Sequence, residues 1–254
     1  MASLTENENY WTQYDWSQGG DEWSATWGGT PYLWWGMLYP RILRSLPTAT
    51  MLEIAPGFGR ITQFLKNFCD RLIVLDLTER CIEACQERFK DASNITYHTN
   101  DGKSLEMIDD GSIDFVFSFD SLVHVEAEEM KSYITELSRK LAPEGVGFFH
   151  HSNIGAFTDP ETGELTIENP HWRAPSMSAQ ILREHAARQG IACVRQELIN
   201  WGGEHLNDCF SFFTRAGSSH DRPFELRENP GFMDEANALG ALARHYAVAP
   251  ESAP

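Results

Sequence analysis

Basic residues are scarce in this chain of 254 residues. Lys and Arg number 20 against 37 Asp and Glu, which leaves a formal net charge of -17 at pH 7. Such a field would repel a phosphate backbone, so we do not expect a nucleic acid as substrate or partner. The same field favours a cationic ligand, although an acidic surface more often serves solubility alone.

Long apolar runs and paired cysteines are missing as well. No stretch approaches the roughly 18 uninterrupted apolar residues of a membrane span, and residues 1–9 lack a signal-peptide pattern. We therefore expect no membrane association and a cytoplasmic location. The five cysteines include no CxxC pair, which argues against a zinc knuckle and a disulfide framework.

Short apolar runs alternate with helical periodicity through the middle of the chain. This alternation implies right-handed crossovers and a mainly parallel sheet with helices on both faces, so the fold class is α/β. Strands are expected at 50–54, 71–75, 95–98, 113–118 and 146–150, and helices at 61–68, 78–89 and 127–141.

The last third of the chain has a different pattern. A helix at 178–189 is followed by strands at 192–199 and 208–214, which are joined too closely to be parallel. We therefore expect a Rossmann-like sheet of seven strands that ends in an antiparallel hairpin, whereas dehydrogenase sheets are typically all parallel.

Length and composition predict one domain over residues 1–254. Within it, residues 1–45 form an aromatic-rich cap that holds six of the eight Trp, and residues 46–215 form the core. Residues 152–177 are long enough for a functional lid. Residues 216–254 form a tail with one helix at 232–246.

A Gly-rich turn follows the first expected strand. The turn reads Gly57-Phe58-Gly59-Arg60, so the third glycine of a dinucleotide fingerprint is absent. An acid, Glu53, precedes it. A carboxylate there would repel a pyrophosphate but would suit a ligand that carries an ammonium and a sulfonium.

The stretch Leu52-Glu53-Ile54-Ala55-Pro56-Gly57-Phe58-Gly59-Arg60 closely resembles the first motif of class I methyltransferases, and the resemblance extends over about residues 51–214. It implies S-adenosylmethionine as the cofactor. It also implies roles by position: the turn lines the methionine moiety, Asp76 holds the ribose, and Asp101 meets the adenine. The cofactor-binding residues expected from it are Glu53, Ala55, Gly57, Gly59, Arg60, Asp76, Leu77, Asp101, Gly102, Phe119, Asp120 and Ser121.

Three alternatives to this interpretation stay open. Asp76 and Asp101 are also the kind of residues that cap strand ends. A cofactor-binding module without catalysis, serving a partner enzyme, would keep the same turn. A nicotinamide dehydrogenase would bind a dinucleotide instead.

Two histidine clusters follow the fourth and fifth core strands, where ligands bind in open α/β sheets. Methyl transfer is an in-line displacement, and a hydroxyl acceptor needs a base to take its proton. Our first candidate for this base is His151 and our second is His124, with Asp120 and Glu126 orienting the imidazole or a substrate hydroxyl. A divalent ion held by these carboxylates and a histidine is conceivable, but no spacing is diagnostic.

The first motif, the run Asp120-Ser121-Leu122-Val123-His124-Val125-Glu126 and residues 150–153 together resemble bacterial saccharide O-methyltransferases. This resemblance implies methylation of a hydroxyl on a small saccharide or glycoside. Indole faces stack on sugar rings, which fits the tryptophans of the cap, although a clamp over the cofactor or a homodimer contact explains them equally well. The alternative is O- or N-methylation of another small metabolite or a natural-product scaffold.

Overall fold

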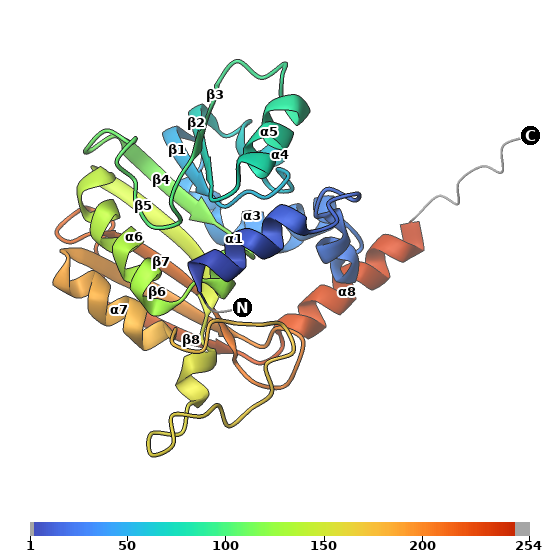
Figure 1. Ribbon diagram of the computed structural model, residues 1–254, viewed down its shortest axis with the longest axis vertical. Coiled ribbons are helices and arrows are strands. Elements are labelled where there is room, and N and C mark those ends of the chain that lie inside the picture. Colours follow the sequence, from blue (N-terminus) through green and yellow to red (C-terminus); the bar gives the residue numbers. More distant parts are fainter. Residues whose placement is uncertain (1–2, 247–254) are drawn as a thin grey trace, which may run out of the picture.

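The computed structural model describes residues 3–246 of the chain, which fold around one sheet (Figure 1). The strand order is β3-β2-β1-β4-β5-β7-β6-β8. The strands are β1 (Thr48–Ile54), β2 (Cys69–Asp76), β3 (Ile95–Thr99), β4 (Ile113–Ser118), β5 (Leu141–Ser152), β6 (Ile191–Ile199), β7 (Asp208–Arg215) and β8 (Glu225–Asn229).

The predicted fold class is confirmed, with one correction to the number of strands. Strands β3, β2, β1, β4 and β5 pair in parallel, and β7 runs antiparallel to both β5 and β6. The sheet has eight strands and not seven, because β8 adds in parallel to β6. Most of β8 is exposed and charged at this edge, so its sequence lacks the buried alternation that reveals a strand.

Helices cover both faces of the sheet (Figure 1). The helices α6 and α7 lie together on one face, while α4, α5 and the cap helices α2 and α3 lie toward the other. None of the helices within residues 3–246 has the length and apolar character that crossing a membrane requires. The helices are α1 (Leu4–Gln13), α2 (Thr30–Leu33), α3 (Tyr39–Ile42), α4 (Thr62–Leu65), α5 (Glu79–Arg88), α6 (Ala127–Lys140), α7 (Ala179–Arg188) and α8 (Phe232–Tyr246).

The alternation of side chains along the central strands produces two hydrophobic cores. In β1, Met51 faces the core that contains Trp34 of the cap, whereas its neighbour Leu52 faces the core under α6 and α7. In β5, Phe148 and Phe149 divide in the same way. The aromatic cap is therefore part of the protein core on one side of the sheet.

The first described helix, α1, is held by a capping box. The Ser3 hydroxyl accepts from the Glu6 backbone N–H at 3.3 Å, and the Glu6 carboxylate accepts from the Ser3 backbone N–H at 3.0 Å. The helix lies across the carboxyl ends of the central strands (Figure 1), where Asn7 donates a 2.9 Å hydrogen bond to the His124 carbonyl. The amino-terminal segment thus covers the edge of the sheet where a ligand is expected.

Candidate active site

The turn after β1 has a backbone that only a few residues can adopt. Ala55, Gly57 and Gly59 all have positive φ angles, of 58°, 58° and 81°. A Cβ on Gly59 would lie 2.5 Å from the Phe89 ring, and one on Gly57 would lie 2.9 Å from the Trp16 ring of the cap. The glycines therefore let α5 and the cap close tightly around the turn.

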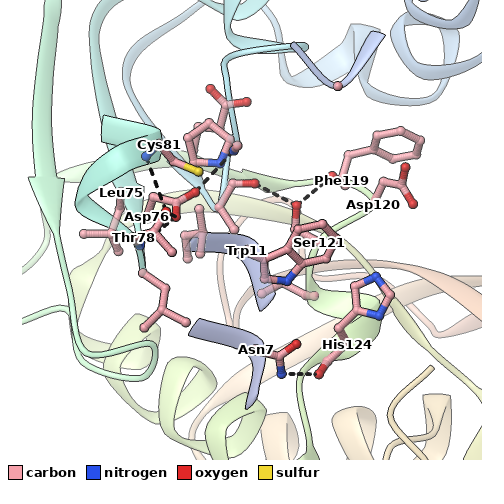
Figure 2. Close-up of a pocket in the computed structure, with 18 of the residues that line it drawn as sticks. Asn7, Trp11, Leu75, Asp76, Thr78, Cys81, Phe119, Asp120, Ser121 and His124 are labelled. Atoms are coloured by element: carbon pink, nitrogen blue, oxygen red, sulfur yellow. Dashed lines mark hydrogen bonds between the residues drawn. The ribbon is translucent and has the colours of Figure 1, made fainter. Parts of the chain in front are cut away.

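A cavity opens between this turn, the ends of β1, β2 and β4, and the cap (Figure 2). The predicted cofactor residues that line it are Glu53, Ala55, Gly57, Arg60, Asp76, Leu77, Gly102, Phe119, Asp120 and Ser121. From the cap it is lined by Leu4, Asn7, Trp11, Trp16, Gly19, Gly20 and Trp23. We call this the cofactor cavity.

Glu53 is a buried acid in the lining of the cofactor cavity. The residue is 2% exposed, and its Oε2 has no hydrogen-bond partner within residues 3–246. Burial, with a smaller effect of the Asp76 charge, raises the pKa of Glu53 to about 8, although the Thr62 side chain opposes this shift. A cationic ligand bound in this cavity would place a positive charge beside the carboxylate and so favour its ionised form.

Asp76 ends β2 with its carboxylate already fixed by the protein. Oδ1 accepts from the Thr78 backbone N–H at 2.9 Å and from its hydroxyl at 3.1 Å, while Oδ2 accepts from the Gly57 N–H at 3.2 Å (Figure 2). Burial raises the pKa of Asp76 to about 6. The residue links the turn to β2 and still faces the cavity, as predicted for a ribose-binding acid.

The acid predicted to meet the adenine does not reach the cavity. Asp101 is exposed, and its Oδ1 accepts from the backbone N–H groups of Lys103 and Ser104 at 3.1 and 2.7 Å. Its neighbour Asn100 lines the cavity instead, with its amide nitrogen donating to the Tyr133 hydroxyl at 3.0 Å. Asp101 is thus a local turn-forming residue, the alternative that the sequence left open.

A second cavity adjoins the first and shares Trp11, Trp23, Asp120 and His124 with it. Trp172 is half-exposed at this cavity. Its remaining lining residues are Tyr10, Tyr14, His171, Trp172, Arg173 and Trp201. We call it the acceptor cavity because it meets the cofactor cavity at the shared residues.

His124 is the only one of the two predicted bases that lies at this junction. Its Nδ1 is 3.0 Å from the Trp172 carbonyl, which only accepts, so Nδ1 carries the proton and Nε2 keeps a lone pair. Burial and the nearby charge of Arg173 lower the pKa of His124 to about 4. The ring is therefore neutral at pH 7 but weakly basic.

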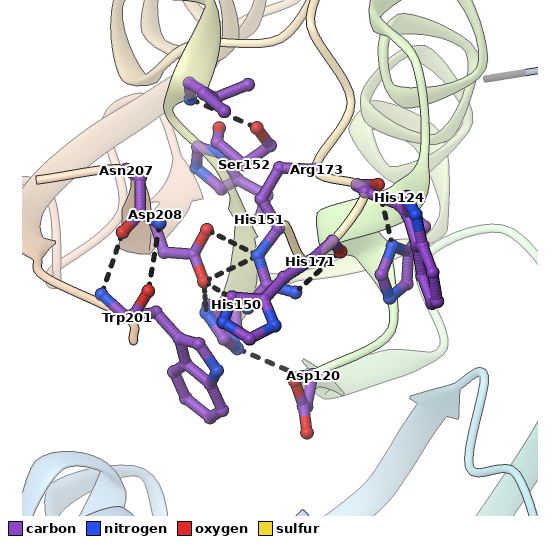
Figure 3. Close-up of polar contacts among 12 residues, drawn as sticks. Asp120, His124, His150, His151, Ser152, His171, Arg173, Trp201, Asn207 and Asp208 are labelled. Atoms are coloured by element: carbon purple, nitrogen blue, oxygen red, sulfur yellow. Dashed lines mark hydrogen bonds and ion pairs between the residues drawn. The ribbon is translucent and has the colours of Figure 1, made fainter. Parts of the chain in front are cut away.

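His151, our first candidate for the base, lies outside both cavities. It is fully buried, with Nδ1 2.8 Å from the Ser152 carbonyl and Nε2 2.8 Å from the Ser211 hydroxyl (Figure 3). Both ring nitrogens are thus occupied, and burial lowers the pKa of His151 to about 4. This geometry argues against the predicted role, because both ring nitrogens are bonded inside the protein and the ring reaches neither cavity.

Glu126, the other predicted partner of the imidazole, is also outside the cavities. Its Oε2 accepts from the backbone N–H of Ser176 at 3.1 Å and from the Ser176 hydroxyl. It therefore ties the predicted lid segment to the start of α6. Gly59 likewise does not line the cofactor cavity but packs against Phe89.

Several lining residues had no place in the sequence-based prediction. Among them are the α1 residues Leu4 and Asn7, together with His171 and Arg173 from the 152–177 segment. The spacing of Ser3 and Glu6 is the one signal that could have revealed α1. Within residues 3–246, no group of three or more His, Cys, Asp or Glu side chains is placed to hold a metal ion.

The sheet order and the cavity at its carboxyl-end edge are those of the class I, Rossmann-like S-adenosylmethionine-dependent methyltransferase fold. The comparisons with known proteins agree, since residues 52–149 match the family model of a methyltransferase domain. S-adenosylmethionine is the cofactor named for a solved structure with this fold, and the buried Glu53 carboxylate fits its positive charge.

Curated relatives are similar over part of their length. A phosphoethanolamine N-methyltransferase of Triticum aestivum is 30% identical over 150 residues, covering 57% of this chain and 30% of that protein. A second such enzyme of Triticum aestivum is 26% identical over 201 residues, covering 73% of this chain and 39% of that protein. The chain thus spans well under half the length of these relatives.

Solved structures show the same fold at low identity. An S-adenosylmethionine-dependent methyltransferase of Clostridium acetobutylicum has a TM-score of 0.56 and 12% identity, covering 71% of this chain and 89% of that chain. A Galdieria sulphuraria protein, provisionally named a sarcosine dimethylglycine methyltransferase, has a TM-score of 0.58 and 15% identity, covering 74% and 87%.

Proposed function

We propose that the protein transfers the methyl group of S-adenosylmethionine to an amine nitrogen of a small molecule. The observation that carries this proposal is the composition of the acceptor cavity, which is walled by aromatic rings beside one carboxylate, Asp120. The rings are Tyr10, Trp11, Tyr14, Trp23, Trp172 and Trp201. Aromatic faces with a nearby acid attract ammonium groups by cation–π and Coulomb interactions.

The strength of the available bases favours nitrogen over oxygen. A sugar or alcohol hydroxyl needs a base as its oxygen attacks. The histidines of the acceptor cavity are His124, with its pKa lowered to about 4, and His171, whose pKa burial also lowers. A neutral amine attacks through its own lone pair, so it does not need a strong base to remove a proton as it attacks.

The cofactor, when bound, supplies an electrophilic methyl group and a thioether leaving group. The acceptor amine would take up this methyl group, and the positive charge would then lie on its nitrogen. Asp120, which lines both cavities, would face that charge, and the cap side chains would exclude water. The Nε2 lone pair of His124 would accept a hydrogen bond from the amine N–H and so orient the nitrogen lone pair, while the proton of the product would leave to water.

The curated relatives support the amine, because those reported above are named N-methyltransferases of phosphoethanolamine. The cofactor roles of the lining residues, Asp76 and Arg60 among them, are part of the same proposal. The division into one domain over 1–254, the cytoplasmic location and the homodimer stay predictions, and residues 1–2 and 247–254 lie outside the described part.

Saccharide O-methylation is the second candidate. It is favoured by indole faces beside hydrogen-bonding side chains, namely Trp172 and Trp201 beside His171. It requires a stronger base than the cavity histidines provide, so it ranks below the amine.

An acceptor screen tests the proposal. The protein is incubated with S-adenosylmethionine and separate sets of small amines, saccharides and phenols, and each product is read by mass for one added methyl group. We expect products among the amines. Methylated saccharides or phenols with unchanged amines would reject the proposal while keeping the fold and the cofactor.

A further inference from the structure

The carboxylate between the two cavities stands on an unusual backbone. Asp120 follows β4 with a φ angle of 59°, a left-handed conformation that is uncommon for residues other than glycine. Its Oδ2 accepts from Arg60 at 2.8 Å, and both side chains are largely buried. Such a conformation persists only where surrounding groups hold it.

One of those groups is the ring of His150. The Asp120 backbone N–H donates to His150 Nδ1 at 3.1 Å, so this nitrogen carries a lone pair and no proton (Figure 3). The ring is fully buried and packs against the rings of Phe119 and Trp201, each with its centroid 5.1 Å away. Packing therefore restricts its position in addition to the hydrogen bonds.

The hydrogen bond at the second ring nitrogen, Nε2, sets the tautomer of His150. Nε2 lies 3.0 Å from Asp208 Oδ2, and Asp208 also accepts from Arg173 Nη2 at 2.7 Å and from its Nε at 3.0 Å. Burial alone would raise the pKa of Asp208, but Arg173 and His150 hold it at about 2. An ionised carboxylate only accepts, so Nε2 must carry the ring proton.

We propose that His150 is a positioning residue, locked by Asp208 in the tautomer that accepts from the Asp120 backbone and so aims the Asp120 carboxylate at the junction of the cavities. The proposal rests on the proposed function, in which this carboxylate faces the charge of the transferred methyl group. The chain Arg173–Asp208–His150–Asp120 thereby connects the wall of the acceptor cavity to its acid.

A purely structural role for His150 would be to satisfy the buried Asp208. Two substitutions separate these roles, because each keeps one of the two hydrogen bonds. His150→Asn retains an acceptor oxygen near the Nδ1 position, for Asp120. His150→Gln retains a donor near the Nε2 position, for Asp208.

The measurement is calorimetric binding of S-adenosylmethionine and of S-adenosylhomocysteine, which differ by the charged methyl group. A displaced Asp120 carboxylate should weaken the charged ligand more than the neutral one, by about fivefold. We expect this loss for His150→Gln and a ratio near that of the unchanged protein for His150→Asn. The matched control is His151→Gln, on the same strand but outside the cavities.

Equal ratios in both variants, or a loss confined to His150→Asn, would overturn the proposal. Should the variants fail to fold, 15N chemical shifts of the histidine rings in the unchanged protein decide, because a protonated Nδ1 at His150 contradicts it. Neither readout needs an acceptor, so failure of the amine proposal in the mass screen is a separate outcome.

Discussion

At the scale of single residues, the unpaired carboxylate of Glu53 links cofactor binding to pH. Burial raises its pKa from 4.5 to about 8, so the folded protein without ligand holds a proton that the unfolded chain releases. The unliganded protein should therefore lose stability as pH rises from about 4.5 through 8. Binding of a cationic ligand stabilises the ionised carboxylate, so Glu53 releases its proton on binding.

We expect the Glu53→Gln variant to become more stable relative to the unchanged protein as pH rises from 5 to 8. We also expect this variant to bind S-adenosylmethionine at least about tenfold more weakly at pH 8. Thermal unfolding across pH measures the first effect. Calorimetry in two buffers of different ionisation enthalpy measures the second, as proton release on binding. A melting-temperature difference that does not change with pH would show that Glu53 is ionised in the empty site.

We expect opposite effects on kcat from substituting the two candidate bases. His124→Ala should lower kcat by roughly 10- to 100-fold, because it removes the Nε2 lone pair at the junction of the cavities. His151→Gln should keep kcat within about threefold and destabilise the protein by about 1–3 kcal/mol, because it disturbs two buried hydrogen bonds. Turnover with the acceptor found in the mass screen, and denaturant unfolding, check the pair. A large loss of kcat in His151→Gln alone would restore that residue as the base.

The sequence predicted more of the residues that line the cofactor cavity than of those that line the acceptor cavity alone. Glu53, Asp76 and Asp120 follow from strand ends and the Gly-rich turn, which are local features. The roles of His150 and His151 depend on β7, which approaches β5 from 60 residues away and supplies Asp208 and Ser211. No local pattern reveals which histidine such a strand will bury or bind.

At the scale of elements, α1 closes the cofactor cavity. Leu4, Asn7 and Trp11 line it, and the Arg80 side chain donates to the Thr12 carbonyl at 2.6 Å at the end of the helix. Next to α1, Trp16 stacks on Phe58 of the turn with centroids 4.6 Å apart. We expect some of these contacts to open when the cofactor enters.

We expect S-adenosylhomocysteine to slow amide hydrogen exchange in residues 4–13 by at least tenfold. Exchange in α8, which does not line either cavity, should change far less. The measurement is exchange followed by mass spectrometry of peptides with and without ligand. Equal protection of α1 in both states would show that the helix stays closed and that the ligand enters elsewhere.

Elements with a strong local pattern were predicted closely, and those that depend on neighbours were not. The predicted bounds of β4 and α8 are those of the structure. The helix expected at 61–68 is only α4 (Thr62–Leu65), because the chain after Leu65 tightens into turns in which the N–H groups of Asn67 and Phe68 donate to the carbonyls of Phe64 and Leu65. The apolar spacing of the sequence does not distinguish such turns from a continuing helix.

At the scale of the whole molecule, one buried ion pair joins distant segments. Arg41 of the cap donates to both oxygens of Glu197 in β6, at 3.0 and 2.9 Å, and to Glu235 of α8 at 3.0 Å. Burial alone would raise the pKa of Glu197, but its bonds to Arg41 lower it. The stability that this pair contributes is therefore present above about pH 4.5 and is lost as pH falls through the lowered pKa.

Replacing Arg41 removes the main compensation of the buried Glu197 charge, which keeps the Asn229 amide at 2.8 Å and Arg227 at 4.0 Å. We expect Arg41→Met to destabilise the protein by about 3 kcal/mol, or roughly 6–12 °C in Tm, at pH 7. The difference should shrink below pH 4.5. Arg188→Met, which removes an exposed pair with Glu184 at 3.6 Å, should cost less than about 1 kcal/mol. Scanning calorimetry at several pH values compares the two, and similar losses would refute the role of burial.

Two glycines bring the cap and α8 into close contact. A methyl group on Gly240 of α8 would lie 2.2 Å from the Thr26 carbonyl, and one on Gly28 would lie 2.1 Å from Ala243. Residues 26–28 of the cap and α8 thus touch where neither Gly28 nor Gly240 can be replaced by a larger residue, and the same cap segment carries Trp23, which lines both cavities. We therefore expect substitutions in α8 to shift the cap wall of both cavities, although no residue of α8 lines either of them.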